Sequence, residues 1–290
     1  MSGPGADELG PEEFARLHTR LLGLAYRMLG GWADAEDVAA ETWLRWHTSR
    51  PDDLVHPQAW LTTVATRLSL DRWRTLARRR EDYVGPWLPE PIDPGRLPHE
   101  TVEQRESLAF GLLHLMERLT SDERAVYVLR YAFDHSFAEI AEMLGRTPAS
   151  CRQLAHRARA RVAPDGVGGS RSAQRALLDR LVAAIADGRA GDAVAMITED
   201  AVLISDGGGK VKSALRPILG PDKIVRFLVG ISRAVPGATL TAIDVNAGAA
   251  LLLRQGAERR LLRIDTRDGA ISAVHLVGNP DKLDRLELPA

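Results

Sequence analysis

Apolar side chains fall three or four positions apart from Phe14 to Met28, and two glycines then end the pattern. This spacing places the apolar residues on one face of a helix. A second amphipathic helix is expected from Asp34 to His47, where acidic residues occupy the outer face. A third is expected to begin at Pro57 and to end in the basic residues 78–80. The segment 11–81 is therefore predicted to be helical throughout.

Five prolines between residues 84 and 98 interrupt this periodicity, so no regular helix crosses the segment. We expect an extended linker, although Trp87 and Ile92 make it more apolar than linkers usually are. Helical spacing resumes over residues 102–162. A run of glycine and serine at residues 166–170 then marks a second boundary.

The last third of the chain has a mixed pattern. Short apolar runs joined by turn residues predict strands, and longer amphipathic stretches predict helices. The predicted helices cover residues 173–187, 192–198 and 221–233, and the predicted strands cover residues 201–205, 239–246, 249–254, 259–266 and 271–277. This part is therefore expected to be α+β, after two all-α parts.

Composition narrows the class of protein. The 290 residues carry a net charge of −1, so any nucleic-acid surface must be local. The single cysteine, Cys151, excludes a disulfide within the chain and fits a reducing compartment. The N-terminus lacks the basic start and apolar stretch of a signal peptide, and no apolar run reaches the roughly 20 residues that span a bilayer. We expect a cytoplasmic protein with no membrane association.

Residues 136–161 carry the strongest local motif, a helix, a glycine turn at Gly145 and a second helix that Thr147 can cap. Such an arrangement with a basic, polar outer face is typical of a helix-turn-helix. Arginine and glutamine are suited to guanine and adenine edges, and further arginines to phosphates. A helical hairpin with a solvated basic face is the alternative. The predicted DNA-binding residues are Arg152, Gln153, His156, Arg157 and Arg159.

These segments resemble a known family, the extracytoplasmic-function sigma factors of bacterial RNA polymerase. Residues 21–30 (LLGLAYRMLG), 33–38 (ADAEDV) and 59–64 (AWLTTV) look like sigma region two, and residues 104–162 look like region four. Three stretches, WLPEP at 87–91, DGGGKV at 206–211 and NPDKL at 279–283, resemble signatures of one subgroup. In that subgroup a cone-shaped, α+β SnoaL-like domain follows region four. The expected domains are region two at 1–82, a linker at 83–103, region four at 104–163 and the SnoaL-like domain at 172–290.

The resemblance implies three partner surfaces: promoter DNA at two elements and core RNA polymerase. Region four is expected to read the −35 element through the helix-turn-helix. The acidic helix is expected to contact the clamp helices of the β′ subunit, with further contacts to the β subunit; a merely solvated face is the alternative. Aromatic and arginine side chains suit a melted −10 strand, although each tryptophan could equally be a core residue. The predicted polymerase-binding residues are Asp34, Glu36, Asp37 and Glu41, and the predicted −10 residues are Trp60, Arg67, Arg72, Trp73, Arg74 and Arg78.

The appended domain offers little evidence of catalysis. We find no metal-ligand spacing and no nucleophile beside a base, so no enzyme activity and no cofactor are expected. Asp206, Arg263, Asp265 and His275 are candidate polar groups of a pocket, although a lone histidine on a strand is more often a core residue. The glycines at 207–209 lack the P-loop spacing and more simply permit a tight turn or a close approach of backbone.

We expect the linker, the glycine loop and the C-terminal motif to form one regulatory contact, so that the appended domain controls the sigma regions in cis. Its expected residues are Trp87, Leu88, Pro89, Asp206, Gly207, Gly208, Lys210, Asn279, Pro280, Asp281 and Lys282. An unidentified small molecule remains a candidate ligand of this domain. Two alternative functions stay open: a ligand-responsive helix-turn-helix regulator without polymerase, and an enzyme in the C-terminal domain.

Overall fold

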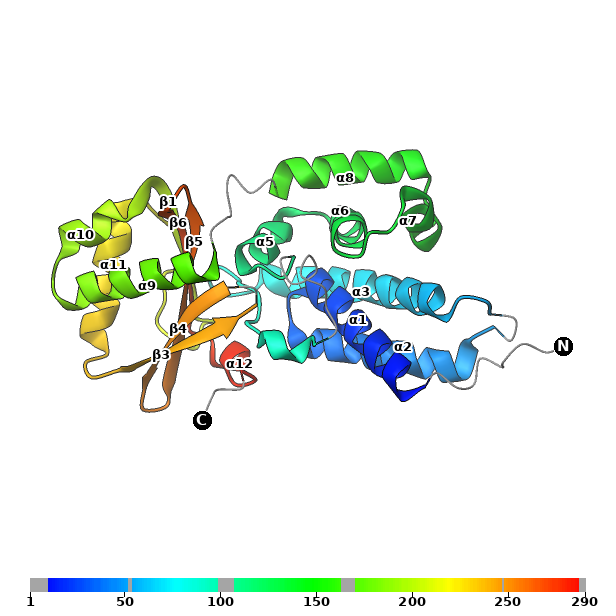
Figure 1. Ribbon diagram of the computed structural model, residues 1–290, viewed down its shortest axis with the longest axis horizontal. Coiled ribbons are helices and arrows are strands. Elements are labelled where there is room, and N and C mark those ends of the chain that lie inside the picture. The colour runs from blue at the N-terminus through cyan, green and yellow to red at the C-terminus, as the bar shows by residue number, and fades with distance from the viewer. Residues whose placement is uncertain (1–9, 52–53, 99–106, 163–169, 247, 287–290) are drawn as a thin grey trace. The chain divides into compact units, whose positions relative to one another are not determined.

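The computed structural model describes residues 10–51, 54–98, 107–162, 170–246 and 248–286 (Figure 1). Contacts divide the chain into two compact units. Unit 1 contains residues 1–79, 95–108 and 115–163, and unit 2 contains residues 80–94, 109–114 and 164–290. The proline-rich segment 80–94 therefore packs with the C-terminal unit. The expected linker end at 99–103 and the expected helix start near Val102 lie outside the described residues.

Unit 1 is helical, as the apolar spacing predicts. Gly30 ends the first helix in the left-handed conformation (φ 71°), which glycine adopts without strain. The second helix begins two residues earlier than expected, at Trp32, whose ring is buried. The helices of unit 1 are α1 (Pro11–Leu29), α2 (Trp32–Ser49), α3 (Pro57–Glu81), whose last two residues belong to unit 2, α6 (Ser121–Tyr127), α7 (Phe137–Leu144) and α8 (Pro148–Val162), with a π-helical turn at Val128–Ala132.

Two buried arginines join the early and late helices of unit 1. Arg27 is fully buried and donates to the carbonyl oxygen of Gly23 and to the Ser107 hydroxyl. Arg124 is also fully buried; it donates to the carbonyl oxygen of Arg27 and pairs with Glu117. Because each of these buried guanidinium groups has hydrogen-bond partners, its burial is compensated, and the Arg124 contact joins α6 to the end of α1.

Unit 2 is built on one six-stranded sheet in the order β2-β1-β6-β5-β4-β3, in which only β1 and β6 run parallel. The expected helix over 192–198 is wrong at its end. Ile197 pairs with Ile271 and opens β1, so tertiary pairing overrides the local helical pattern. The strands are β1 (Ile197–Asp206), β2 (Ile218–Leu219), β3 (Thr239–Val245), β4 (Gly248–Gln255), β5 (Glu258–Arg267) and β6 (Ala270–Val277).

The two faces of the sheet have different covers. Helices α9 (Arg171–Ala186), α10 (Ala190–Ala195) and α11 (Pro221–Ala234) lie over one face (Figure 1), and their side chains share a core with Leu203, Ile264 and Val274. Leu88 of the linker, Phe110 of α5 (Phe110–Leu115) and Leu283 of α12 (Pro280–Leu283) share a second core with Ile204 and Leu261. Adjacent strand residues point to opposite faces, so this second core lies on the other side of the sheet.

The expected fold class is confirmed: two helical regions are followed by an α+β domain. The structure adds one unexpected detail. Residues 109–114, which we expected in the helix-turn-helix domain, group with the sheet of unit 2. Among the described residues, no helix is both long and apolar enough to cross a membrane.

Candidate functional site

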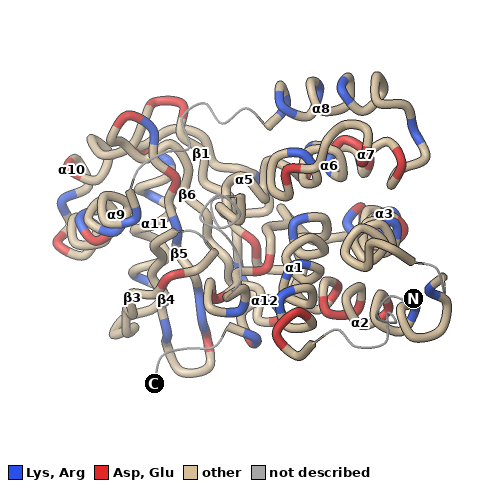
Figure 2. The backbone as a smooth tube through the Cα atoms, turned by 45° about the vertical axis from the view of Figure 1, so that its right-hand side comes forward, with Lys and Arg blue, Asp and Glu red and all other residues tan. Residues whose placement is uncertain are grey.

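The helix-turn-helix forms as its capping residues predict. Ser136 and Glu139 make a capping box at the start of α7, and Gly145 ends that helix at φ 63°. The Thr147 hydroxyl accepts the backbone N–H of Ser150 at the start of α8. Arginines recur along α8 (Figure 2). The inner face of α8 buries Cys151, Leu154, Ala155, Ala158 and Val162, whereas Arg152, Gln153, His156, Arg157 and Arg159 are exposed.

A buried carboxylate fixes the orientation of α8. The side chain of Glu123 is only 3% exposed, and it lies 3.3 Å from Arg157 and 2.5 Å from Arg161. Burial opposes its ionisation, but hydrogen bonds from Thr120 and the two arginines lower its pKa below the usual value. The predicted phosphate contact Arg157 is thus already held by an ion pair, although its side chain stays 55% exposed.

The predicted −10 and polymerase-binding residues meet at one ion-pair cluster. The Arg72 guanidinium lies 2.7 Å from Asp34 and 2.9 Å from Asp37, so α3 is tied to the acidic helix α2. Arg74 pairs with Asp71 on its own helix. These contacts leave two of the acidic residues and two of the −10 arginines partly neutralised in this state.

Other predicted surface residues have partners within unit 1. Arg67 Nε donates to the carbonyl oxygen of Met143 in α7, at 3.0 Å. Trp60 is half-buried and packs edge-on against the buried Trp46, and Trp73 is also half-buried. Glu36 accepts a hydrogen bond from the Trp32 indole, and Glu41 pairs with Arg45. A groove between α2 and α3 of about 610 Å³ is lined by the 56%-exposed Leu44 and the acidic Asp37 and Glu41.

A fully buried carboxylate, Asp206, holds the linker to the sheet of unit 2. One Asp206 oxygen accepts the Tyr83 hydroxyl at 2.6 Å and the Gly208 N–H at 3.0 Å. The other oxygen accepts the Leu88 backbone N–H at 2.9 Å and the Lys282 ammonium at 2.6 Å. Lys282 also donates to the carbonyl oxygen of Leu88, and Asn279 donates to the Tyr83 hydroxyl at 2.9 Å. We call these five residues, Tyr83, Leu88, Asp206, Asn279 and Lys282, the linker latch.

The side chains around the latch explain the remaining motif residues. The Trp87 ring makes two cation–π contacts, with Arg80 at 3.7 Å and Lys282 at 4.1 Å from its centroid. Lys210 pairs with Asp281 at 2.6 Å on the surface. A Cβ at Gly208 would lie 2.3 Å from the Asn279 amide, so only glycine fits there.

The structure therefore brings together the three motif stretches within unit 2. Pro89 is buried in the linker, Gly207 is tightly packed in the turn, and Pro280 opens α12. Tyr83 was not predicted as a member of this contact; burial and the hydrogen bond to Asp206 raise the pKa of its hydroxyl. Its only signal in the sequence was a tyrosine three residues before the first proline of the linker, Pro86.

Our prediction of pocket polar groups is wrong in its location. Asp206, Arg263, Asp265 and His275 lie on the sheet face that the linker and α5 cover. Arg263 and Asp265 form a buried pair at 2.9 Å, and a Cβ at Gly111 of α5 would lie 2.1 Å from the Asp265 carboxylate. His275 packs against Phe110, and burial lowers its pKa to about 4, against the opposing effect of Asp265. A histidine with this pKa is neutral near pH 7, as expected of a core residue.

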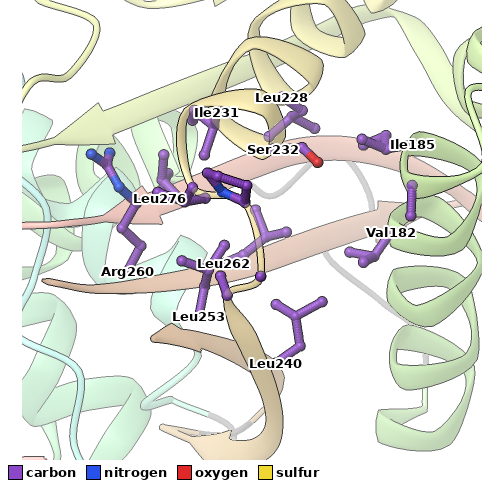
Figure 3. Close-up of a pocket in the computed structure, with 15 residues that line it drawn as sticks. Val182, Ile185, Leu228, Ile231, Ser232, Leu240, Leu253, Arg260, Leu262 and Leu276 are labelled. Carbon is purple, nitrogen blue, oxygen red and sulfur yellow. The ribbon is translucent and has the colours of Figure 1, made fainter. Parts of the chain in front are cut away.

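The cavity of unit 2 lies on the opposite face, between α9, α11 and strands β3 to β6 (Figure 3). Its volume is about 350 Å³, and most of its lining is aliphatic. None of the four predicted polar groups lines it. The residues described by the structure contain no group of three or more His, Cys, Asp or Glu side chains that could hold a metal ion.

Comparisons with known proteins define the class. The family model for sigma-70 region 2 matches residues 14–79, and that for sigma-70 region 4 matches residues 110–162. The ECF RNA polymerase sigma factor SigJ of Mycobacterium tuberculosis is 38% identical over 288 residues, covering 93% of this chain and 92% of SigJ. The crystal structure of that SigJ covers 97% of this chain and is itself covered fully, with a TM-score of 0.78 and 35% identity. The ECF sigma factor SigW of Bacillus subtilis is 29% identical over 148 residues, or 47% of this chain and 77% of SigW.

The two sigma regions are followed by an α+β domain, and the similarity to SigJ extends over nearly the whole of both chains. The protein is therefore a sigma factor with an appended C-terminal domain. The chain belongs to the ECF RNA polymerase sigma factors. The match to region 4 begins at residue 110, so the first helix of that region, α5, is the one that packs on the sheet.

Replacing Lys282 with methionine is expected to weaken the linker latch. The change leaves the fully buried Asp206 carboxylate without its counter-ion, and removal of one partner from a buried pair costs about 3 kcal/mol. Lys210→Met is the matched control, because its pair with Asp281 is more than half exposed and is worth less than about 1 kcal/mol. Urea unfolding of the full chain measures both; equal losses of stability would contradict the assigned role of Lys282.

Proposed function

We propose that this protein brings core RNA polymerase to promoters by using α8 for the −35 element, α3 for the −10 element and α2 for the polymerase. The observation that carries the −35 assignment is the exposed row Arg152, Gln153, His156 and Arg159 on a helix whose other face is buried. Arginine and glutamine near the start of such a helix reach guanine and adenine edges in the major groove. Arg157 is expected to add a phosphate contact while Glu123 holds it in place.

For the −10 element we propose contacts from Trp60, Arg67, Arg72, Trp73, Arg74 and Arg78, which combine rings with positive charge. Arg67 and Arg72 must first leave Met143 and the acidic pair Asp34 and Asp37. Release of Arg72 would also free those two carboxylates, which would join Glu36 and Glu41 in binding a basic surface such as the β′ clamp helices. The exposed Leu44 in the neighbouring groove supplies an apolar contact for the same docking.

We propose further that the appended domain inhibits initiation through the linker latch. The −10 and −35 elements are separated by about 25 base pairs, or about 85 Å at 3.4 Å per pair. The 28 residues between α3 and α5, residues 82–109, can extend to about 90 Å. When residues 83–94 and 109–114 are both held on the sheet, only residues 95–108 join the two attached segments, and 14 residues can extend to at most about 45 Å. A closed latch therefore limits the length of chain that joins the two DNA-binding regions to about half of its extended value.

The buried ion pair makes the docking of the linker sensitive to a single charge. Residues 88–92 are all buried and Ile92 exchanges hydrogen bonds with Asn246, but the Asp206 carboxylate is the charged group at this contact that depends on partners from both the linker and α12. Removal of one partner of the Asp206–Lys282 pair, at about 3 kcal/mol, would shift the equilibrium between docked and undocked linker about 100-fold toward the undocked form. The two alternatives have weaker support. A regulator that works without polymerase leaves the match to sigma region 2 at residues 14–79 without a role. For an enzyme, none of Arg263, Asp265 and His275 lines the cavity of unit 2.

Promoter preference is expected to follow the exposed side chains of α8. In run-off transcription with core polymerase and a library randomised in the −35 element, Arg152→Ala and Gln153→Ala should each lose about 1–3 kcal/mol of discrimination at one base pair. Arg159→Ala should instead weaken all promoters about equally, as loss of a phosphate contact does. An unchanged preference in both base-reading variants would reject the assignment of α8, and no initiation by any form would reject the sigma function itself.

Opening the latch is expected to raise initiation. Lys282→Met in the full chain should increase transcripts from a suitable promoter several-fold at limiting protein, because the linker regains its full reach. The exposed-pair control Lys210→Met should stay within about twofold of the unchanged chain. A decrease with Lys282→Met, while core polymerase is still bound, would show that the docked linker activates rather than inhibits.

A further inference from the structure

The cavity of unit 2, which we call the apolar pocket, has no part in the proposed contacts with DNA or polymerase. Its walls come from helices and strands that lie on one side of the sheet, and their side chains point toward one space (Figure 3). At about 350 Å³ it falls within the range of small-molecule sites. The aliphatic side chains that matter most here are Val182, Ile185, Leu228, Ile231, Leu253 and Leu262.

Two polar side chains line the apolar pocket, and neither favours a charged ligand. Arg260 is 7% exposed, and its charge is matched by Glu258, which accepts both Nε and Nη2 of Arg260. Its remaining nitrogen, Nη1, donates to the carbonyl oxygen of Lys212 at 3.2 Å. Ser232 contributes one exposed hydroxyl at the wall. An anion would have to take Arg260 from Glu258, whereas a neutral molecule needs no such exchange.

We propose that the apolar pocket binds an uncharged, largely apolar small molecule, with at most one hydrogen bond to Ser232, and that its occupancy acts on the linker latch. The second part rests on the proposed inhibition in cis; the binding site itself does not. Burial of apolar ligand surface against the aliphatic walls supplies the affinity.

Arg260 links the apolar pocket to the linker latch. Its partner Lys212 lies in the loop that follows Asp206. A Cβ at Gly278 would lie 3.8 Å from the Arg260 side chain, and the Gly278 N–H donates to the carbonyl oxygen of Asp206 at 2.7 Å. Leu276 of β6 also lines the pocket, and Gly278 follows it by two residues, just after the end of that strand. A ligand that displaces Arg260 or Leu276 therefore moves the backbone on which Asp206 and Asn279 are held.

Binding is tested with N-phenyl-1-naphthylamine, a neutral fluorescent probe, and with 8-anilinonaphthalene-1-sulfonate, a related anion. The full chain should bind the neutral probe saturably and the anion at least tenfold more weakly. Ser232→Phe and Ala186→Phe each fill the pocket from a different helix and should weaken the neutral probe at least tenfold. Arg226→Phe, at an exposed position of α11 outside the lining, should stay within twofold. The site is overturned if the full chain binds no neutral probe, if it binds the anion more tightly, or if both filled variants bind the neutral probe as tightly as the unchanged chain.

Coupling is tested by hydrogen exchange of the linker, residues 83–92, in the full chain. Saturating neutral probe should change the exchange rate of this segment, which includes the Leu88 amide bound to Asp206, at least threefold. Arg260→Met should still bind the probe and should lose most of that change. Unchanged exchange with bound probe overturns the coupling. Because neither measurement uses polymerase, a failure here is distinct from a failure of inhibition, which the Lys282→Met transcripts report.

Discussion

The structure of the C-terminal unit depends on one fully buried carboxylate. Asp206 ends β1, and its two oxygens accept four hydrogen bonds, two of them from the linker and one from the ammonium of Lys282. A buried charge without such partners would cost several kcal/mol, so the linker, the glycine loop and α12 must be in place together. The same requirement makes the contact cooperative, since loss of one partner weakens the others. It explains why three short stretches far apart in the sequence meet at one place in unit 2.

The connectivity of the chain is the reason for proposing that this local contact acts on both sigma regions. The linker leaves the end of α3 and α5 begins region 4, and both are held on the same face of one sheet. Within unit 1, Arg72 is tied to the acidic helix and Arg67 to α7, so the proposed DNA-binding side chains are already engaged. The sheet is a single layer, with the apolar pocket on one face and the linker on the other. A molecule bound in the apolar pocket is therefore separated from the linker latch by the thickness of one sheet.

Much of this arrangement could be predicted from the sequence, and the failures have a common cause. Capping residues and glycines at Gly30, Gly145 and Gly208 depend on local geometry, so the helix ends and the close approach of the glycine loop were readable. Strand alternation does not tell which side of a sheet the helices cover, so Asp206, Arg263, Asp265 and His275 were taken as pocket groups although they lie on the face away from the cavity. The packing of α5 on Asp265, the tie of Arg72 to α2 and the role of Tyr83 are long-range contacts without a local pattern.

A reversible covalent lock across the linker tests the central claim most directly. A Cβ built at Gly209 lies 3.2 Å from the Cβ of Val84, so Val84→Cys with Gly209→Cys can form a disulfide after a shift of a few tenths of an ångström. Gly209 has a φ of 71°, so the new cysteine strains the backbone there, but the oxidised and the reduced forms of the variant share this strain. The only native cysteine, Cys151, is buried. The measurement is promoter-dependent transcription by core polymerase with this variant, oxidised and cleared of oxidant, before and after reduction. We predict that reduction raises initiation several-fold and that the unchanged chain does not respond. Equal initiation by the fully cross-linked and the reduced forms would contradict control through the linker.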